Sequence, residues 1–248
     1  MIDPGAMANA APNPQYNVAA PDGIAARVAA WQRRRMYQRF VRDCSVTARD
    51  SILDLGVTSD RSYSSSNYLE AWHPYKGNIT AAGIDDASFL EPQYPGVRFV
   101  YANGLKLPFR DQAFDVVHSS AVLEHVGSDA EQATYVRECA RVARRAVFLT
   151  TPNRWFPMEF HTSLPLAHWL PKRQFRALLR RIDMGFFADE RHLNLLTRRE
   201  LRALAPAGAY AFTVSHVSLL GWPSNLLLVG TRKSLQAERA PRVGEVLR

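Results

Sequence analysis

The chain has 248 residues, a formal net charge of +8, and 47% hydrophobic and 22% charged residues. This composition is typical of a globular protein that can bury a core, and it excludes collagen-like and disulfide-rich classes. No apolar run has the length of a membrane-spanning helix. Cys44 and Cys139 are far apart and show no metal-ligand spacing. We therefore expect a cytoplasmic protein with reduced thiols and no metal site.

The beginning of the chain differs in composition from the rest. Residues 1–21 are rich in Ala, Asn and Pro, and residues 1–7 resemble an expression-vector remnant. Such a stretch has few groups to bury, so we expect a disordered tail. Residues 22–248 are expected to form one domain. It should begin with an amphipathic helix over 23–43, because apolar residues recur there at four-residue steps beside an arginine-rich face.

The period then changes to short apolar runs separated by helical patterns. Five expected strands cover 51–56, 81–85, 97–101, 114–119 and 146–151, with a helix over 130–143 before the fifth; two more strands, 211–219 and 225–231, are expected to form a closing antiparallel pair. Apolar strands that alternate with helices predict a mostly parallel sheet of the α/β class, covered by helices on both faces. Ligands of such sheets bind at the carboxyl ends of the strands.

Residues 154–195 interrupt this alternation. The segment starts with an aromatic, proline-punctuated run and continues into a basic helical pattern at 172–181. We expect it to be an insertion that covers the carboxyl edge of the sheet as a substrate lid. A helix should restart after Thr197, because Thr197 and Glu200 have the spacing of a capping box.

Two neighbouring stretches are the most specific in the chain. Residues 105–117 read LKLPFRDQAFDVV, and residues 121–126 read AVLEHV. They resemble the "LPF…FDVV" and "LEHV" segments of class I methyltransferases, specifically of the type 11 branch. The resemblance extends over about residues 50–235. It implies a Rossmann-like seven-stranded sheet and S-adenosylmethionine as the cofactor.

The resemblance implies roles for residues that follow the second and third strands. Asp85 would accept hydrogen bonds from the ribose hydroxyls of the cofactor, and Asn103 would bond the adenine amino group. Gly104 and Leu105 would offer backbone donors and a wall for the ring. The alternatives are ordinary: Asp85 can cap the helix that follows, and Asn103 can form an Asn-Gly turn.

The loop after the first strand departs from the family pattern of an acidic residue followed by G-x-G-x-G. Asp54 is present, but Gly56 is the only one of the three glycines, and Thr58 takes part in the remaining loop. Glycines let the backbone approach a ligand closely, so this departure leaves open a chain that keeps the fold without tight cofactor binding. Ser119, after the fourth strand, would face the methionine end of the cofactor.

Three residues are candidates for the catalytic machinery. Methyl transfer is mainly a positioning problem, with a base needed where the acceptor atom carries a proton of high pKa. His125 is the family-like choice of base, and Glu159 with His161 lies in the expected lid near the acceptor. The alternative interpretation is that His125 is a helix-cap or packing histidine and that His161 is a hydrogen-bonded histidine of the lid.

The sequence supports more than one function. The first hypothesis is a methyltransferase that acts on a small-molecule or lipid-like acceptor, at an oxygen atom. The second is a basic module that binds nucleic acid, although no nucleic-acid signature is recognisable. A third is an enzyme in peripheral contact with a membrane, since the aromatic run at 155–170 precedes basic residues. A non-catalytic relative of the fold also remains open, and the oligomeric state is not addressed by the sequence.

Overall fold

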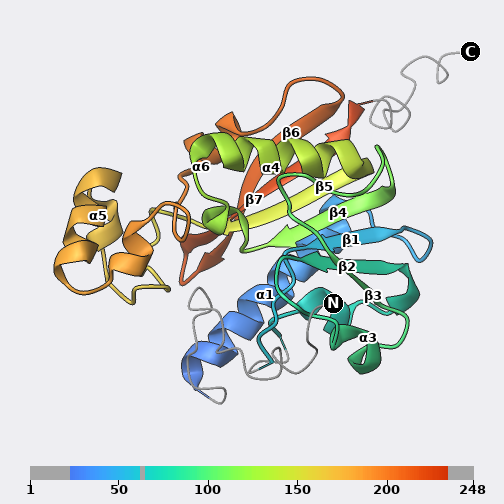
Figure 1. Cartoon of the computed structure of the whole chain (residues 1–248), viewed down its shortest axis with the longest axis horizontal. Coiled ribbons are helices and arrows are strands. Elements are labelled where there is room, and N and C mark those ends of the chain that lie inside the picture. Colours follow the sequence, from blue (N-terminus) through green and yellow to red (C-terminus); the bar gives the residue numbers. More distant parts are fainter. Residues whose placement is uncertain (1–22, 62–64, 234–248) are drawn as a thin grey trace, which may run out of the picture.

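The computed structural model describes residues 23–61 and 65–233 (Figure 1). The disordered tail expected over residues 1–21 lies outside these described residues. Among the described helices, none combines the length and the apolar character needed to cross a lipid bilayer.

A single seven-stranded sheet organises the described chain, in the order β3-β2-β1-β4-β5-β7-β6. The strands are β1 Ile52–Leu55, β2 Ile79–Gly83, β3 Arg98–Tyr101, β4 Phe114–Ser120, β5 Ala143–Pro152, β6 Tyr210–Leu219 and β7 Trp222–Arg232. The first five pair in parallel, whereas β7 runs antiparallel to both β5 and β6. The predicted Rossmann-like sheet with its closing antiparallel pair is confirmed.

The helices cover both faces of this sheet (Figure 1). They are α1 Ile24–Asp43, α2 Tyr68–Trp72, α3 Leu90–Gln93, α4 Asp129–Val142, α5 Lys172–Arg181 and α6 Arg198–Ala203, with short 3-10 turns η1 Lys76–Asn78, η2 Leu123–His125, η3 Ala167–Trp169 and η4 Gly185–Ala188. α4 and α6 each begin with a capping box, from Ser128 to Glu131 and from Thr197 to Glu200. Each box satisfies backbone N–H groups that the first turn leaves without partners.

Two apolar clusters show why the central strands are buried on both sides. Val136 of α4 packs with Leu53 and Val147 on one face. Phe40 of α1 packs with Phe148 on the opposite face. Successive strand residues point to opposite faces, so strands apolar at every position need a helix layer on each side. The helix expected over 23–43 is present as α1, and it packs on the sheet through Phe40.

The chain leaves the sheet after β5 and returns to it through α6. We call the intervening residues 154–195 the inserted segment. It has a small core of its own, made by Phe175, Leu179, Ala188, Leu193 and Leu195. Figure 1 shows its helix α5 at one end of the molecule, beyond the ends of β4 and β5.

Asn194 fastens the inserted segment to the turn that follows β4. Its backbone N–H donates to the carbonyl oxygen of Glu124 at 2.7 Å, and its Nδ2 donates to the carbonyl oxygen of Gly127 at 2.8 Å. Gln132 of α4 donates from Nε2 to the carbonyl oxygen of Asn194 at 3.0 Å. Because Asn194 and Gln132 are both buried, losing either partner leaves polar groups unsatisfied away from water. These contacts set the inserted segment over the ends of β4 and β5.

Candidate functional site

The carboxyl ends of β1, β2 and β3 lie side by side, because these parallel strands pair in register. Leu55 pairs with Ala82, and Gly83 pairs with Tyr101. The residues expected to hold a cofactor therefore follow neighbouring strand ends, with Gly56 after β1, Asp85 after β2 and Asn103 after β3. This is the edge at which doubly wound sheets bind ligands.

The surface around Asp85 has the chemistry that a nucleoside needs. Asp85 is partly exposed, and the neighbouring Ile84 is 70% exposed although it is a large apolar residue. Asn103 is also exposed, and its Oδ1 accepts a hydrogen bond from the backbone N–H of Leu105 at 2.9 Å. A carboxylate beside an exposed apolar side chain and an amide matches a ribose diol attached to an aromatic base. The residues at β2 and β3 thus fit the nucleoside part of the expected cofactor.

Gly104 is required by the packing beneath this surface. A Cβ atom on Gly104 would lie 2.3 Å from Cε2 of Tyr135, a residue of α4. The ring of Tyr135 is buried, and its hydroxyl bonds Ser119 Oγ at 2.8 Å. Ser119 is therefore held inside the core, 2% exposed. Its expected contact with the methionine end of the cofactor stays a prediction.

The loop after β1, which departs from the G-x-G-x-G pattern, is closed by hydrogen bonds to Asn67. The backbone N–H of Thr58 donates to Asn67 Oδ1 at 2.9 Å, and Asn67 Nδ2 donates to the carbonyl oxygen of Thr58 at 3.0 Å. The hydroxyl of Thr58 accepts from the backbone N–H of Asp60 at 3.0 Å. Gly56 is at φ +95°, and a Cβ there would lie 2.2 Å from Val122 Cγ2. The one retained glycine is thus needed for backbone conformation and packing, and Asn67 holds the loop through the backbone of Thr58.

Asp54 lies in a buried polar cluster behind this loop. Its Oδ1 accepts from Nδ1 of His118 at 2.7 Å, and the other ring nitrogen of His118 bonds the hydroxyl of Tyr68 at 2.8 Å. Burial, together with the charge of Asp54, raises the pKa of the neighbouring Glu70 well above its ordinary range. The sequence indicated Asp54 but not the roles of Tyr68 and Glu70. A contact of Asp54 with the cofactor remains a prediction.

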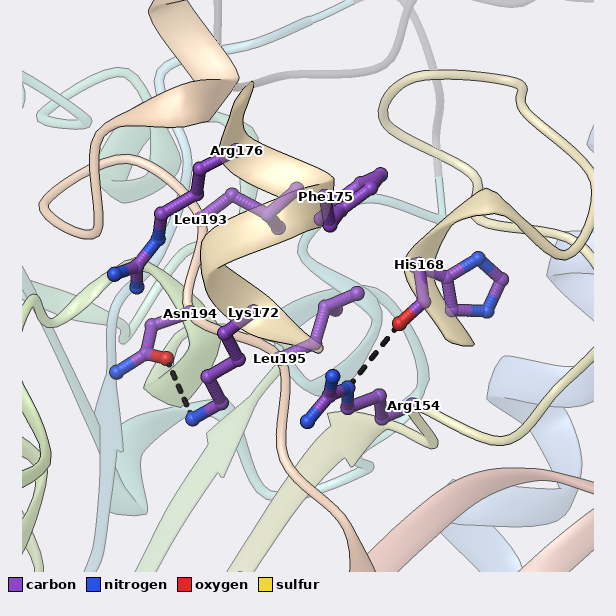
Figure 2. Close-up of a pocket in the computed structure, with 8 residues that line it drawn as sticks. All are labelled: Arg154, His168, Lys172, Phe175, Arg176, Leu193, Asn194 and Leu195. Atoms are coloured by element: carbon purple, nitrogen blue, oxygen red, sulfur yellow. Dashed lines mark hydrogen bonds between the residues drawn. The ribbon is translucent and has the colours of Figure 1, made fainter. Parts of the chain in front are cut away.

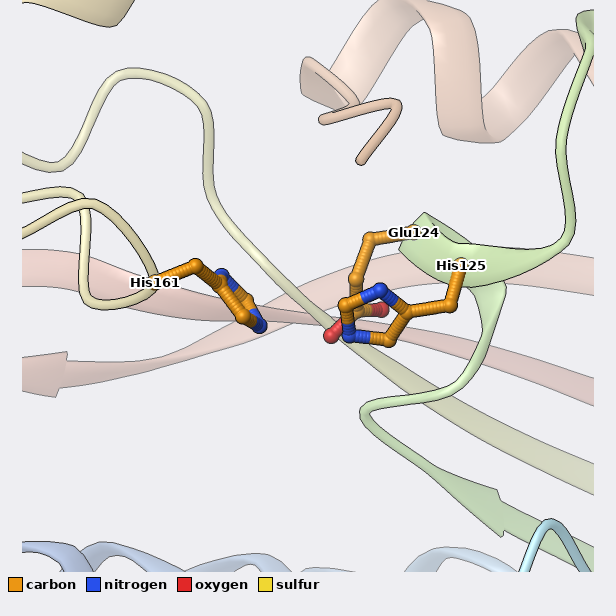
Figure 3. Close-up of side chains that lie close together, drawn as sticks. All are labelled: Glu124, His125 and His161. Atoms are coloured by element: carbon orange, nitrogen blue, oxygen red, sulfur yellow. The ribbon is translucent and has the colours of Figure 1, made fainter. Parts of the chain in front are cut away.

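A second group of polar side chains meets beyond the end of β4. Figure 3 shows His161, from the inserted segment, pointing toward Glu124 and His125 of η2. One ligand-type atom of each side chain lies within 4.8 Å of the others. The rings of His125 and His161 are 4.8 Å apart between centroids and 80° apart in plane. His125 and His161 were separate candidates on sequence, and the fold brings them together.

Glu159 orients His161. Its Oε1 bonds Nδ1 of His161 at 2.7 Å, and its Oε2 accepts from the backbone N–H and hydroxyl of Thr162 at 2.6 and 2.7 Å. Burial alone would raise the pKa of Glu159, but the hydrogen bonds from His161 and Thr162 hold it at about 2. Burial alone would lower the pKa of His161, but the contact with Glu159 raises it instead. The arrangement matches a base and its orienting carboxylate.

His125 is oriented by a carbonyl group. Its Nδ1 lies 2.6 Å from the carbonyl oxygen of His192. A carbonyl oxygen only accepts, so Nδ1 carries the proton and the Nε2 of a neutral ring keeps its lone pair. Burial lowers the pKa of His125 to about 4, which keeps the ring neutral at pH 7.

Glu124 is the member of this group that the sequence did not single out as catalytic. It is fully buried, and its Oε2 accepts from the hydroxyl of Thr151 at 3.0 Å. Its Oε1 has no hydrogen-bond partner among the described residues. Burial raises the pKa of Glu124 to about 7. A buried carboxyl group with one oxygen left without a partner is costly, so Glu124 is a pointer to function.

Two small cavities are lined mainly by residues of the inserted segment. The larger, shown in Figure 2, is bordered by the cationic side chains Arg154, Lys172 and Arg176; its other lining residues are His168, Phe175, Leu193, Asn194 and Leu195. The second is mostly apolar and includes Phe156, Met158, Phe160 and Glu159. Glu159, which bonds His161, is thus shared between this second cavity and the histidine pair.

Large apolar side chains are exposed on the inserted segment and around the turn between β6 and β7. Trp155 is 45% exposed and Trp222 is 46% exposed, while Leu220, at the turn between β6 and β7, is 97% exposed. Nε1 of Trp222 donates to the carbonyl oxygen of Trp155 at 2.9 Å, and Trp169 stacks on Trp222. The inserted segment and the β6–β7 turn therefore share one exposed aromatic surface, which we call the tryptophan surface. Apolar surface of this kind is typical of contact with an apolar partner or substrate.

Part of the chain is similar in sequence to known methyltransferases. Residues 53–150 match the family model described as "Methyltransferase domain". The chain is 34% identical over 130 residues to the probable S-adenosylmethionine-dependent methyltransferase Rv3030 of Mycobacterium tuberculosis (strain H37Rv). That alignment covers 50% of this chain and 43% of the relative. The chain thus matches less than half the length of this curated relative.

Solved structures share the fold. The YcgJ protein of Bacillus subtilis superposes with a TM-score of 0.54 at 16% identity, over 80% of this chain and 98% of that one. The magnesium protoporphyrin IX methyltransferase of Synechocystis, solved with bound S-adenosylhomocysteine, superposes with a TM-score of 0.53 at 13% identity, over 88% of this chain and 91% of that one. At such identities the likeness concerns the fold alone.

Proposed function

Residues 53–150 belong to the class I S-adenosylmethionine-dependent methyltransferase family, and from this premise we propose that the chain methylates a small-molecule or lipid-like acceptor at an oxygen atom. The observation that carries the proposal is the meeting of His125, His161 and Glu124 at the end of β4, on the same sheet edge as Asp85. One edge then offers both a nucleoside site and polar groups for an acceptor.

The cofactor part of the proposal rests on the β2 and β3 ends. Asp85 would bind the ribose hydroxyls, with Asn103, Gly104 and Leu105 beside the adenine. When bound there, S-adenosylmethionine supplies a methyl group already activated by a sulfonium. The protein's task is then to place an acceptor oxygen in line with that methyl group and to exclude water.

The inserted segment would act as the lid over the acceptor. His161, oriented by Glu159, would take the proton of an acceptor hydroxyl, with His125 as the neighbouring neutral acceptor of a hydrogen bond. A hydroxyl is the acceptor group that benefits most from this, because its proton has a high pKa and must leave as the oxygen is methylated. This supports a hydroxyl acceptor over a neutral amine, which is nucleophilic enough to attack without the help of a base.

The tryptophan surface supports a lipid-like acceptor. Trp155, Trp222 and Leu220 are exposed. α5, in the same inserted segment as Trp155, carries Arg173, Arg180 and Arg181. Exposed tryptophans beside basic residues are the composition of a segment that rests on a membrane surface. We propose that the protein contacts such a surface peripherally when it takes up its acceptor.

Two measurements test the proposed function. Titration calorimetry with S-adenosylhomocysteine should give saturable binding; absence of heat at millimolar ligand would contradict the cofactor part. Co-sedimentation with phosphatidylcholine vesicles, with and without phosphatidylglycerol, tests the acceptor class. The wild type should sediment with vesicles, and Trp155→Ala combined with Trp222→Ala should lose most of that binding, whereas His216→Ala, on the exposed side of β6, should not. Binding to duplex DNA at about 0.2 M salt, without vesicle binding, would favour the nucleic-acid alternative instead.

A further inference from the structure

Glu124, His125 and His161 form a ligand set for a metal ion. We propose that these three side chains bind a divalent transition-metal ion such as Zn²⁺, Fe²⁺, Mn²⁺ or Co²⁺. Their ligand-type atoms lie within 4.8 Å of one another. Ligands that each lie about 2.1 Å from a tetrahedral ion are about 3.4 Å from one another. The side chains would therefore have to draw together by up to about 1.4 Å to close on an ion, through changes of side-chain torsion angles.

The hydrogen bonds at Nδ1 of His125 and His161 orient both rings for metal binding. Nδ1 of His125 donates to the carbonyl oxygen of His192 at 2.6 Å, and Nδ1 of His161 bonds Oε1 of Glu159 at 2.7 Å. Metal-binding histidines almost always use one ring nitrogen in this way, toward a carbonyl or a carboxylate, and bind the ion with the other. Both rings here leave Nε2 as the ligand atom, and Figure 3 shows both rings turned toward Glu124.

A second, independent observation is that one oxygen of the Glu124 carboxylate has no partner among the described residues. The residue is fully buried, Thr151 holds Oε2 at 3.0 Å, and Oε1 has no hydrogen-bond partner among the described residues. A buried carboxylate oxygen without a donor costs free energy unless a cation compensates it. An ion between Glu124 and the two imidazoles satisfies that oxygen, whereas packing histidines would leave it unsatisfied.

The ligand types select the kind of ion. Two imidazoles and one carboxylate favour Zn²⁺ or Fe²⁺-like ions over Mg²⁺ and Ca²⁺, which prefer oxygen ligands throughout. Three protein ligands leave at least one coordination position open, as in catalytic sites. Sequence spacing did not predict this site, because His161 joins the adjacent Glu124 and His125 only through the docking of the inserted segment.

This inference deepens the proposed function, and its use in catalysis rests on that function. An acceptor hydroxyl in the open position would be oriented by the ion, and its pKa would be lowered so that its proton passes to water. His161 would then be a ligand instead of a free base. Metal binding itself can be measured without any methyl transfer, so the two proposals fail separately.

The test starts from chelator-treated, desalted protein that is titrated with Zn²⁺ in a calorimeter and with Co²⁺ in a spectrophotometer. We expect one ion per chain and a visible Co²⁺ absorption band from nitrogen ligands. His161→Ala, which removes a partly exposed side chain, and Glu124→Gln should each weaken binding at least about tenfold, in line with the loss of one ligand. The control His216→Ala removes a histidine outside the site and should bind like the wild type.

Circular dichroism and S-adenosylhomocysteine binding are recorded on the same samples. A His161→Ala protein that is folded and binds S-adenosylhomocysteine but has lost the ion supports the proposal. If Glu124→Gln does not fold, His125→Asn takes its place. The proposal is overturned if the wild type takes up no ion, or if His161→Ala binds Zn²⁺ as tightly as His216→Ala does. A wild-type protein that binds the ion but not S-adenosylhomocysteine would instead contradict the proposed cofactor site.

Discussion

The imidazole rings of His125 and His161 face each other at 4.8 Å between centroids, although they belong to η2 and to the inserted segment. Their contact depends on how these two segments are joined. The carbonyl oxygen of Glu124, next to His125, accepts from the backbone N–H of Asn194 at 2.7 Å. The proposed acceptor site therefore exists only while the inserted segment is docked.

Asn194→Ala should loosen this docking. The substitution removes the Nδ2 donor to the carbonyl oxygen of Gly127 and the Oδ1 acceptor for Lys172. Because Asn194 is buried, we expect a loss of about 1–3 kcal/mol of unfolding free energy, measured by urea denaturation. Asn78→Ala, which removes an exposed hydrogen bond to the carbonyl oxygen of Ala48, is the control. Equal stability of the two variants would show that Asn194 does not hold the segment.

Asp85→Ala should weaken cofactor binding. Hydrogen bonds to a charged group contribute about 1.5–3 kcal/mol, which corresponds to roughly 10- to 100-fold in affinity for S-adenosylhomocysteine. Asp86→Ala is the matched comparison, since the Oδ1 of Asp86 is used by the backbone N–H of Ser88 at 2.9 Å. Calorimetry should show a large loss for Asp85→Ala and less than about a twofold change for Asp86→Ala. The reverse order would move the ribose site to Asp86.

His161→Ala should reduce methyl transfer much more than cofactor binding. His161 either takes the proton of the acceptor hydroxyl or binds the ion that lowers the pKa of that hydroxyl. In both cases, removal of the His161 side chain should lower the rate by about 10²–10⁴-fold. The measurement is transfer of label from S-adenosylmethionine to a panel of phenols and hydroxylated lipids, with His216→Ala as the control. Unchanged turnover by a folded His161→Ala protein would remove the histidine pair from the mechanism.

Glu70→Gln should change how stability depends on pH. Burial raises the folded-state pKa of Glu70 above its ordinary value of 4.5, and Asp54 adds to this. A group whose pKa is raised in the folded state contributes its full stability below its pKa in the unfolded chain. That contribution is lost as the pH rises toward its pKa in the folded protein. A neutral amide has no such loss, so Glu70→Gln should gain stability relative to the wild type from pH 5 to pH 8.

Thermal melts across this range provide the measurement. Asp183→Asn, at an exposed carboxylate on the inserted segment, is the control and should run parallel to the wild type. A constant difference between Glu70→Gln and the wild type at every pH would mean that Glu70 is ionised in the folded protein.

Local patterns predicted the sheet, but they did not predict every boundary. The last strand was expected over 225–231, but β7 already begins at Trp222. Leu220 at φ +51° and Gly221 at φ +81° make a two-residue turn, which suits the twist of a hairpin. Pro223 can follow directly because the pairing is irregular between Val217 and Ser218.

The candidate site was harder to predict than the fold. The positions of Asp85 and Asn103 follow from strand ends, which periodicity reveals. The clamp of Asn67 on Thr58 and the meeting of Glu124 with His161 depend on how loops close, and no fixed sequence spacing encodes that. Glu124 could be recognised only once its burial and its unpartnered oxygen were known.

The cofactor site at Asp85 is tested most directly by a crystal structure of the protein with S-adenosylhomocysteine. We expect the ribose hydroxyls within hydrogen-bond distance of the Asp85 carboxylate, with the sulfur on the side of Glu124, His125 and His161. A ligand bound elsewhere, or a cleft at the ends of β2 and β3 filled by the protein's own side chains, would contradict this expectation.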